Sequence, residues 1–203
     1  SATVAQKDGG VHPINRRRRP AENGCCAAVA VPWSSPTLER MHQYDLDYAG
    51  SFADVARIFC RWCEETDGPK TAKAAATWLS TLHAGALALP LVETYDDSDP
   101  PDLPRELLEK VKVGLAPYWG LYYRMVFDPA PLGAEEPVMG DLGDDLEDVY
   151  RDIRRGLFLF ENERRAAAVW HWRFHHEIHW GQHACAALYA LHHYAQEHGE
   201  NAL

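Results

Sequence analysis

Apolar residues that recur at helical spacing constrain the fold of this chain more than any other feature. From Phe52 onward they return every three or four residues, in stretches that Pro and Gly interrupt, and no strand-like alternation persists. We expect five helices, over about 51–66, 71–89, 104–123, 141–160 and 163–198. The predicted fold class is all-α: a single helical bundle with a long C-terminal helix and an irregular N-terminal tail.

Capping residues, Pro and Gly predict where these helices begin, bend and end. Ser51 is the expected N-cap of the first helix, and Pro104 the first residue of the third. Pro117 should kink or split the third helix. The fifth would be on the order of 50 Å long, and a break near Gly181 is expected.

The chain divides into a tail and one domain. Its 203 residues suffice for one well-buried core, which we expect over residues 41–203. Residues 1–40 mix Gly, Pro and a four-arginine run without a period, and are predicted to be a flexible or loosely docked basic tail. Met41 lies close to the point where helical periodicity begins. Two explanations of the tail therefore stay open: translation starts at Met41 and the tail comes from a start codon assigned too far upstream, or the tail docks on the domain.

Net charge and cysteine content restrict the class of partner and the cellular compartment that we expect for this chain. A formal net charge of −10 argues against nucleic acid as the main partner, and the run Arg16–Arg19 is predicted to be solvated. Five cysteines without a regular framework favour reduced thiols in a cytoplasm. Cys60 and Cys63 lie within a helix and are expected to be core thiols, and the Cys25–Cys26 pair is interpreted as incidental. Without an 18-residue apolar run or a signal peptide, we expect a soluble, intracellular protein with no membrane partner.

Two long motifs carry a resemblance. The first runs from Gly140 to Leu157 with acidic residues at Asp144, Asp145, Asp148 and Asp152; the second joins Trp172-x-Phe174 to His179-Trp180-Gly181-x-His183. With segments 52–62 and 79–90, they resemble the bacterial domain-of-unknown-function family 5063, over roughly residues 44–193. The resemblance implies a small helical domain of bacterial origin. It does not assign any reaction to the chain.

The same motifs contain the candidate functional residues. Asp141, Asp145, Asp148 and Asp152 fall on one stripe of a helix, and their mutual repulsion calls for positive or hydrogen-bonding groups opposite them. The last predicted helix contains histidines at every fourth position: His171, His175, His179 and His183. His176 is expected on the same face as His179 and His183.

Two interpretations of this cluster stay open. In the first, Asp–His hydrogen bonds fix the packing of two helices, and the domain is a non-catalytic interaction or scaffold protein. In the second, a divalent metal is held by Asp145, Asp148, His179 and His183, and the chain is a metal-binding protein or metal-dependent enzyme. The wider polar cluster comprises Asp141, Asp144, Asp152, His175 and His176.

The remaining expectations concern partners. A set of aromatic residues is expected mainly in the core, with a protein-binding groove as the alternative: Tyr118, Trp119, Tyr122, Tyr123, Trp170, Trp172 and Trp180. The expected partner is a protein, and a homo-oligomer is compatible with the sequence. Catalytic residues are not assigned, and whether the chain is an enzyme stays open.

Overall fold

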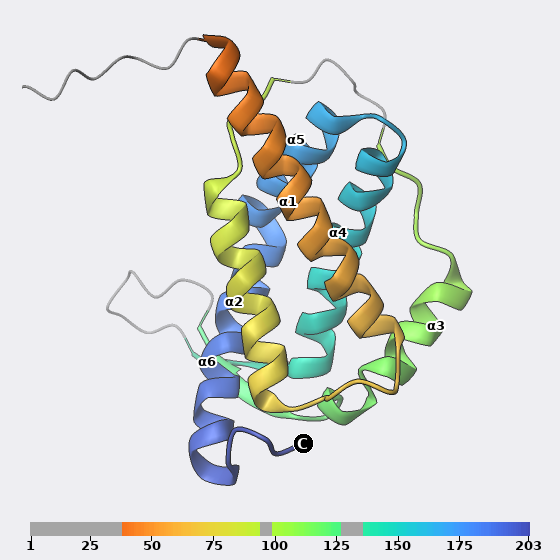
Figure 1. The fold of residues 1–203 in the computed structure, drawn as a ribbon. Helices are drawn as coiled ribbons and strands as arrows, with labels where there is room; N and C mark the ends of the chain where they lie inside the picture. The colour runs from red at the N-terminus through yellow and green to blue at the C-terminus, as the bar shows by residue number, and fades with distance from the viewer. Residues whose placement is uncertain (1–37, 94–98, 127–135) are drawn as a thin grey trace, which may run out of the picture. The chain divides into compact units, whose positions relative to one another are not determined.

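The computed structural model describes residues 38–93, 99–126 and 136–203, with side chains from residue 47 onward. Its helices are α1 Leu38–Glu64, α2 Ala72–Ala88, α3 Arg105–Gly114, α4 Leu142–Glu161, α5 Arg165–His175 and α6 Gly181–His198 (Figure 1). A 3-10 turn, Ala116–Tyr118, follows α3, and a π-helical turn, η2 His176–Trp180, joins α5 to α6. The strands β1 Tyr122–Met125 and β2 Val138–Asp141 form an antiparallel pair. The predicted all-α bundle is confirmed.

Two helices begin at the expected positions because side chains cap them. The Thr71 hydroxyl accepts a hydrogen bond from the Ala74 N–H at 3.1 Å, and the Asp141 carboxylate accepts one from the Gly143 N–H at 2.8 Å. Each cap satisfies an N–H group that the first helical turn leaves unpaired. The predicted fifth helix is confirmed as α5, η2 and α6 in succession, with the π turn directly before Gly181.

Two predicted boundaries are wrong. The first helix begins at Leu38, and Ser51 lies within it, where its hydroxyl donates to the Asp47 carbonyl at 3.0 Å instead of capping an end. The third helix ends at Gly114, and Pro117 splits the segment as expected. However, Gly120 adopts a φ of 79°, which turns the chain out of the helical path, and the residues after it form β1.

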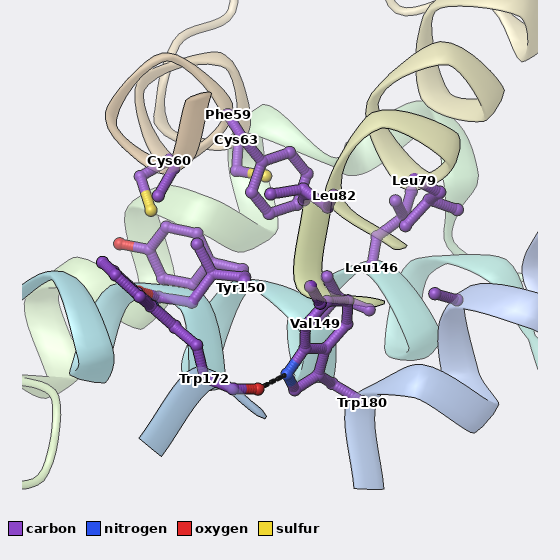
Figure 2. Close-up of a cluster of buried hydrophobic side chains, with 14 of the residues drawn as sticks. Phe59, Cys60, Cys63, Leu79, Leu82, Leu146, Val149, Tyr150, Trp172 and Trp180 are labelled. Atoms are coloured by element: carbon purple, nitrogen blue, oxygen red, sulfur yellow. Dashed lines mark hydrogen bonds between the residues drawn. The ribbon is translucent and has the colours of Figure 1, made fainter. Parts of the chain in front are cut away.

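The hydrophobic core forms where α4 packs against α1 and against the C-terminal helical run (Figure 2). Leu146, Val149 and Tyr150 from α4 meet side chains of α1 and α2 there. Trp180 donates its indole N–H to the backbone carbonyl of Trp172 at 3.1 Å, which ties the buried Trp180 indole to the backbone of α5.

Cysteines and aromatic residues largely occupy the predicted places. Cys60 and Cys63 are buried and free, as expected for core thiols, and burial raises the pKa of each. Tyr118, Trp172 and Trp180 are fully buried, whereas Tyr122 and Trp170 are exposed. Among the described helices, none is long and apolar enough to cross a membrane. Arg16–Arg19 and the Cys25–Cys26 pair lie outside the described residues.

A close approach of α4 and α5 sets which faces of the two helices meet. A Cβ atom at Gly156 would overlap the indole of Trp172, whose N–H donates to the Ile153 carbonyl at 3.0 Å. Only a glycine leaves room for the Trp172 indole against this turn of α4. The helices run antiparallel after a short turn at 162–164, so the beginning of α4 lies opposite α6 and its middle opposite η2.

Candidate metal centre

Two rows of polar side chains face each other across this helix pair. The α4 row contains Asp145, Asp148 and Asp152, and the opposite row contains His171, His175, His179 and His183. Because the helices are antiparallel, Asp145 pairs with the last histidine of the row and Asp152 with earlier ones. The structure therefore brings together residues that the two sequence motifs place far apart.

The π turn η2 keeps the histidines on one face. In a regular α-helix a side chain four positions later lies about 40° further round, so a row with this spacing leaves the interface after two turns. In η2 the Gly181 N–H donates to the His176 carbonyl, five residues back. The wider turn rotates less per residue and offsets the drift. Such turns occur frequently at functional sites.

His179 is held by a buried carboxylate. Its Nδ1 atom lies 2.7 Å from Oδ2 of Asp152, whose residue is only 4% exposed. A carboxylate oxygen accepts hydrogen bonds, so in the neutral imidazole the proton is on Nδ1 and the lone pair is on Nε2. The hydrogen bond thus orients the ring and selects its tautomer.

His183 is held in the same way. Its Nδ1 atom donates to Oδ1 of Asp145 at 2.8 Å, and this bond, acting against desolvation, raises the pKa of His183. The second oxygen of Asp145 accepts a hydrogen bond from the Tyr123 hydroxyl at 2.6 Å. Burial and this hydrogen bond raise the pKa of Tyr123. Both oxygens of Asp145 are therefore engaged behind His183.

Asp148 lies in front of the two histidines. Its Oδ2 atom is 3.6 Å from Nε2 of His183, and one ligand atom from each of Asp148, His179 and His183 lies within 4.8 Å of the others. Burial raises the pKa of Asp148, while the His183 charge opposes that rise. These three residues form what we call the front cluster.

A second group of three residues lies beside the front cluster. One ligand atom from each of Asp152, His171 and His175 lies within 4.8 Å of the others, and His175 Nδ1 is 3.3 Å from Asp152 Oδ1. Burial lowers the pKa of His171 to about 3 and also lowers that of His175. Both imidazoles are therefore neutral at pH 7. These residues form what we call the rear cluster.

Three residues of the predicted polar cluster have other environments. Asp141 caps α4 and also accepts a hydrogen bond from the Gly120 N–H at 2.9 Å. Asp144 is exposed on α4. The Nε2 atom of His176 lies 3.0 Å from Nδ1 of His83 on α2, because η2 turns His176 toward that helix.

Negative charge dominates around the front cluster. Asp144, Asp145, Asp148 and Asp152 lie on the same stretch of α4, and its nearby cation, Arg151, forms an ion pair with Glu147. Several carboxylates around two imidazoles create a potential that attracts a cation.

The front cluster is reached directly from solvent. The side chains of His179 and Asp148 are 44% and 27% exposed. Two grooves of about 550 and 420 Å³ flank β1, and neither is lined by Asp148, His179 or His183. The arrangement suits an ion bound at the surface of the helix pair.

Comparison with known proteins gives a family and a fold. Residues 45–197 match the family described as Domain of unknown function (DUF5063), which covers both motifs. The crystal structure of protein BF1032 from Bacteroides fragilis is similar with a TM-score of 0.55 and 23% identity, over 70% of this chain and 87% of that chain. At this identity the likeness concerns the fold alone. No curated protein matches the sequence, and neither similarity indicates a catalytic activity.

Proposed function

We propose that this chain, which belongs to the family Domain of unknown function (DUF5063), binds a divalent transition-metal ion through Asp148, His179 and His183. The observation that supports the proposal is the pair of buried carboxylates behind the histidines. Histidines that bind metals commonly donate their other ring N–H to a carboxylate, which fixes the tautomer and increases the basicity of the ligand nitrogen.

The donor set indicates the class of ion. Two imidazole nitrogens and one carboxylate oxygen suit Zn²⁺, Fe²⁺ and similar ions, whereas Mg²⁺ and Ca²⁺ prefer oxygen ligands alone. Three protein ligands leave at least one coordination position for water or another small ligand. The proposal concerns binding and assigns no reaction.

The geometry requires only a small closure. A tetrahedral ion with bonds of about 2.0 to 2.2 Å holds its ligands about 3 to 3.5 Å apart. The ligand atoms of the front cluster lie within 4.8 Å of one another. Rotation of the half-exposed His179 and Asp148 side chains supplies the difference, while the buried Asp145 and Asp152 stay in place.

The metal content of untagged protein tests the proposal. The protein is purified without a metal-affinity column or chelator, loaded with Zn²⁺, desalted and analysed for metal, alongside an Asp148→Ala/His183→Ala variant. A His192→Ala/His193→Ala variant is the matched control, since it removes two exposed histidines from the same helix. We expect the control to retain the wild-type content and the first variant to lose about one equivalent. Equal content in all three proteins contradicts the proposal.

A purely structural role is the second candidate. The Asp152–His179 and Asp145–His183 hydrogen bonds join α4 to the C-terminal helical run without any metal. If they serve packing alone, replacing His179 lowers the melting temperature of chelator-treated protein, and Zn²⁺ does not raise the wild-type melting temperature. A metal site predicts that Zn²⁺ raises it, because an ion that binds only the folded state stabilises that state.

The proposed setting is a bacterial cytoplasm with a protein partner. Cys60, Cys63 and Cys185 are free, which is typical of a reducing compartment.

Tyr122 and Tyr189 are each 64% exposed beside the grooves that flank β1, and exposed tyrosines are enriched at interfaces. Light scattering of the purified chain tests the homo-oligomer that the sequence allows.

A further inference from the structure

His171 is a buried histidine with an unpaired ring nitrogen. The residue is 2% exposed, and its Nε2 atom has no hydrogen-bond partner among the described residues. Its ring hydrogen-bonds to the backbone of Asp152, which fixes the ring orientation. Because buried polar atoms are almost always paired, a free imidazole lone pair in this position calls for a partner such as a bound ion or a water molecule.

Two further metal-binding side chains, His175 and Asp152, lie beside His171. The ring centroid of His175 lies 4.2 Å from that of His171, and its Nδ1 atom lies 3.3 Å from Oδ1 of Asp152. The two histidines are one helical turn apart, a spacing that lets both bind one ion. The donor types are again two nitrogens and one carboxylate oxygen.

We propose that the rear cluster, Asp152, His171 and His175, is a second binding site for a divalent transition-metal ion. The inference rests on the proposed function for the class of ion, but it uses none of the front-cluster ligands. Its own support is the buried, unpartnered Nε2 atom of His171 and the convergence of the other two donors.

Asp152 connects the two sites. Its Oδ1 atom faces His175 and belongs to the rear cluster, whereas its Oδ2 atom accepts the Nδ1 proton of His179 from the front cluster. An ion on Oδ1 withdraws electron density from the carboxylate and weakens its hold on that proton. The two dications also repel each other. The sites are therefore negatively coupled, and the second ion binds more weakly than the first.

The charges around the rear cluster also favour weaker binding there. Arg155 lies close enough to lower the pKa of both His171 and His175, and its guanidinium donates to the Pro100 carbonyl at 3.2 Å. Asp99 opposes this effect at His175. The front cluster has more carboxylates around it, so we expect it to fill first and the rear cluster to bind about tenfold or more weakly.

Titration with Co²⁺ and Zn²⁺ tests the second site. Chelator-treated full-length protein is titrated by calorimetry, and Co²⁺ binding is followed by its visible absorption. We expect two equivalents in the wild type and one in His171→Phe, with the tight binding step retained. His175→Ala should behave like His171→Phe; its half-buried position tolerates truncation better. Circular dichroism and melting of the metal-free variants verify that they fold.

The outcomes separate this inference from the proposed function. Wild-type stoichiometry and affinities in both folded rear-cluster variants would overturn the second site and leave the front site standing. If the wild type binds one ion that His171→Phe and His175→Ala lose but Asp148→Ala/His183→Ala keeps, the front site fails and the rear site stands. Both sites are supported if the wild type binds two ions, the two rear-cluster variants lose the weaker one, and Asp148→Ala/His183→Ala loses the tighter one.

Discussion

The Nδ1 atom of His179 lies 2.7 Å from Oδ2 of Asp152, across the interface between α4 and the C-terminal helical run. The other oxygen of the same carboxylate faces His175 at 3.3 Å. Asp152 is therefore the residue through which helix packing and the candidate metal ligands depend on each other.

Replacing Asp152 with Asn should weaken both packing and metal binding. The amide keeps the shape but removes the charge that two histidines face, so we expect a loss of about 1 to 3 kcal/mol in unfolding free energy without metal. Loss of the carboxylate behind His179 should lower the Zn²⁺ affinity of the front cluster about 10- to 100-fold. Urea unfolding with chelator and calorimetric titration measure the two effects. Asp144→Asn is the matched control, since it changes an exposed acid on the same helix; equal effects of both variants would contradict the assigned role.

Substitution of Gly156 by Ala should destabilise the α4–α5 contact. The added methyl group overlaps the buried indole of Trp172, and overpacking of this kind costs about 1 to 3 kcal/mol. Gly50→Ala is the control, because a Cβ atom there meets nothing within 4 Å and an alanine stabilises a helix interior by about 0.5 to 1 kcal/mol. Urea unfolding of the two variants should shift in opposite directions. A Gly156→Ala variant as stable as wild type would show that the helices are further apart than described.

Replacing Gly181 with Ala should lower the metal affinity of the protein without changing its helix content. A Cβ atom at this position overlaps the His176 carbonyl that closes the π turn, so the alanine disfavours η2. A regular α-helix through this region rotates His183 relative to His175. We expect far-ultraviolet circular dichroism to stay close to wild type while Zn²⁺ affinity falls at least about tenfold. Unchanged affinity would mean that the π turn does not position the histidines.

Acid should destabilise the metal-free protein through its buried histidines. Burial lowers the folded-state pKa of His171 to about 3, below the ordinary value near 6.5 of the unfolded chain. Between these values the unfolded state binds the extra proton, so stability falls as the pH falls, by up to about 1.4 kcal/mol per pH unit for this group. His171→Phe should flatten the dependence between about pH 4 and pH 6, measured by urea unfolding with chelator. His192→Ala, at an exposed position, should leave it unchanged; a flattening by that control alone would contradict the assignment.

The row of carboxylates could be predicted from sequence because it depends on helical periodicity alone. Spacings of three and four residues put Asp145, Asp148 and Asp152 on one face, and the structure shows them on the interface with the C-terminal helical run. Which histidine meets which carboxylate depends on the antiparallel register set at Gly156 and on the π turn, and periodicity contains neither. For that reason His176, predicted beside His179 and His183, contacts His83 instead.

The contribution of β1 could not be predicted for a different reason. The helical pattern that begins at Pro104 continues through Tyr122 and Tyr123 in the sequence, and Pro117 signals only a break. The positive φ of Gly120 and pairing with β2 convert the last part into a strand. Tyr123 lies on that strand and donates a hydrogen bond to Asp145. No local sequence pattern relates these two residues.

Anomalous X-ray scattering at the zinc absorption edge tests the central claim most directly. Crystals of the untagged protein grown with Zn²⁺ should show a strong anomalous peak about 2.0 to 2.2 Å from ligand atoms of Asp148, His179 and His183. Asp145 and Asp152 should still be hydrogen-bonded to the Nδ1 atoms of the two histidines. With Zn²⁺ in excess, the absence of a peak between these three side chains would contradict the account and leave the Asp–His pairs as packing interactions alone.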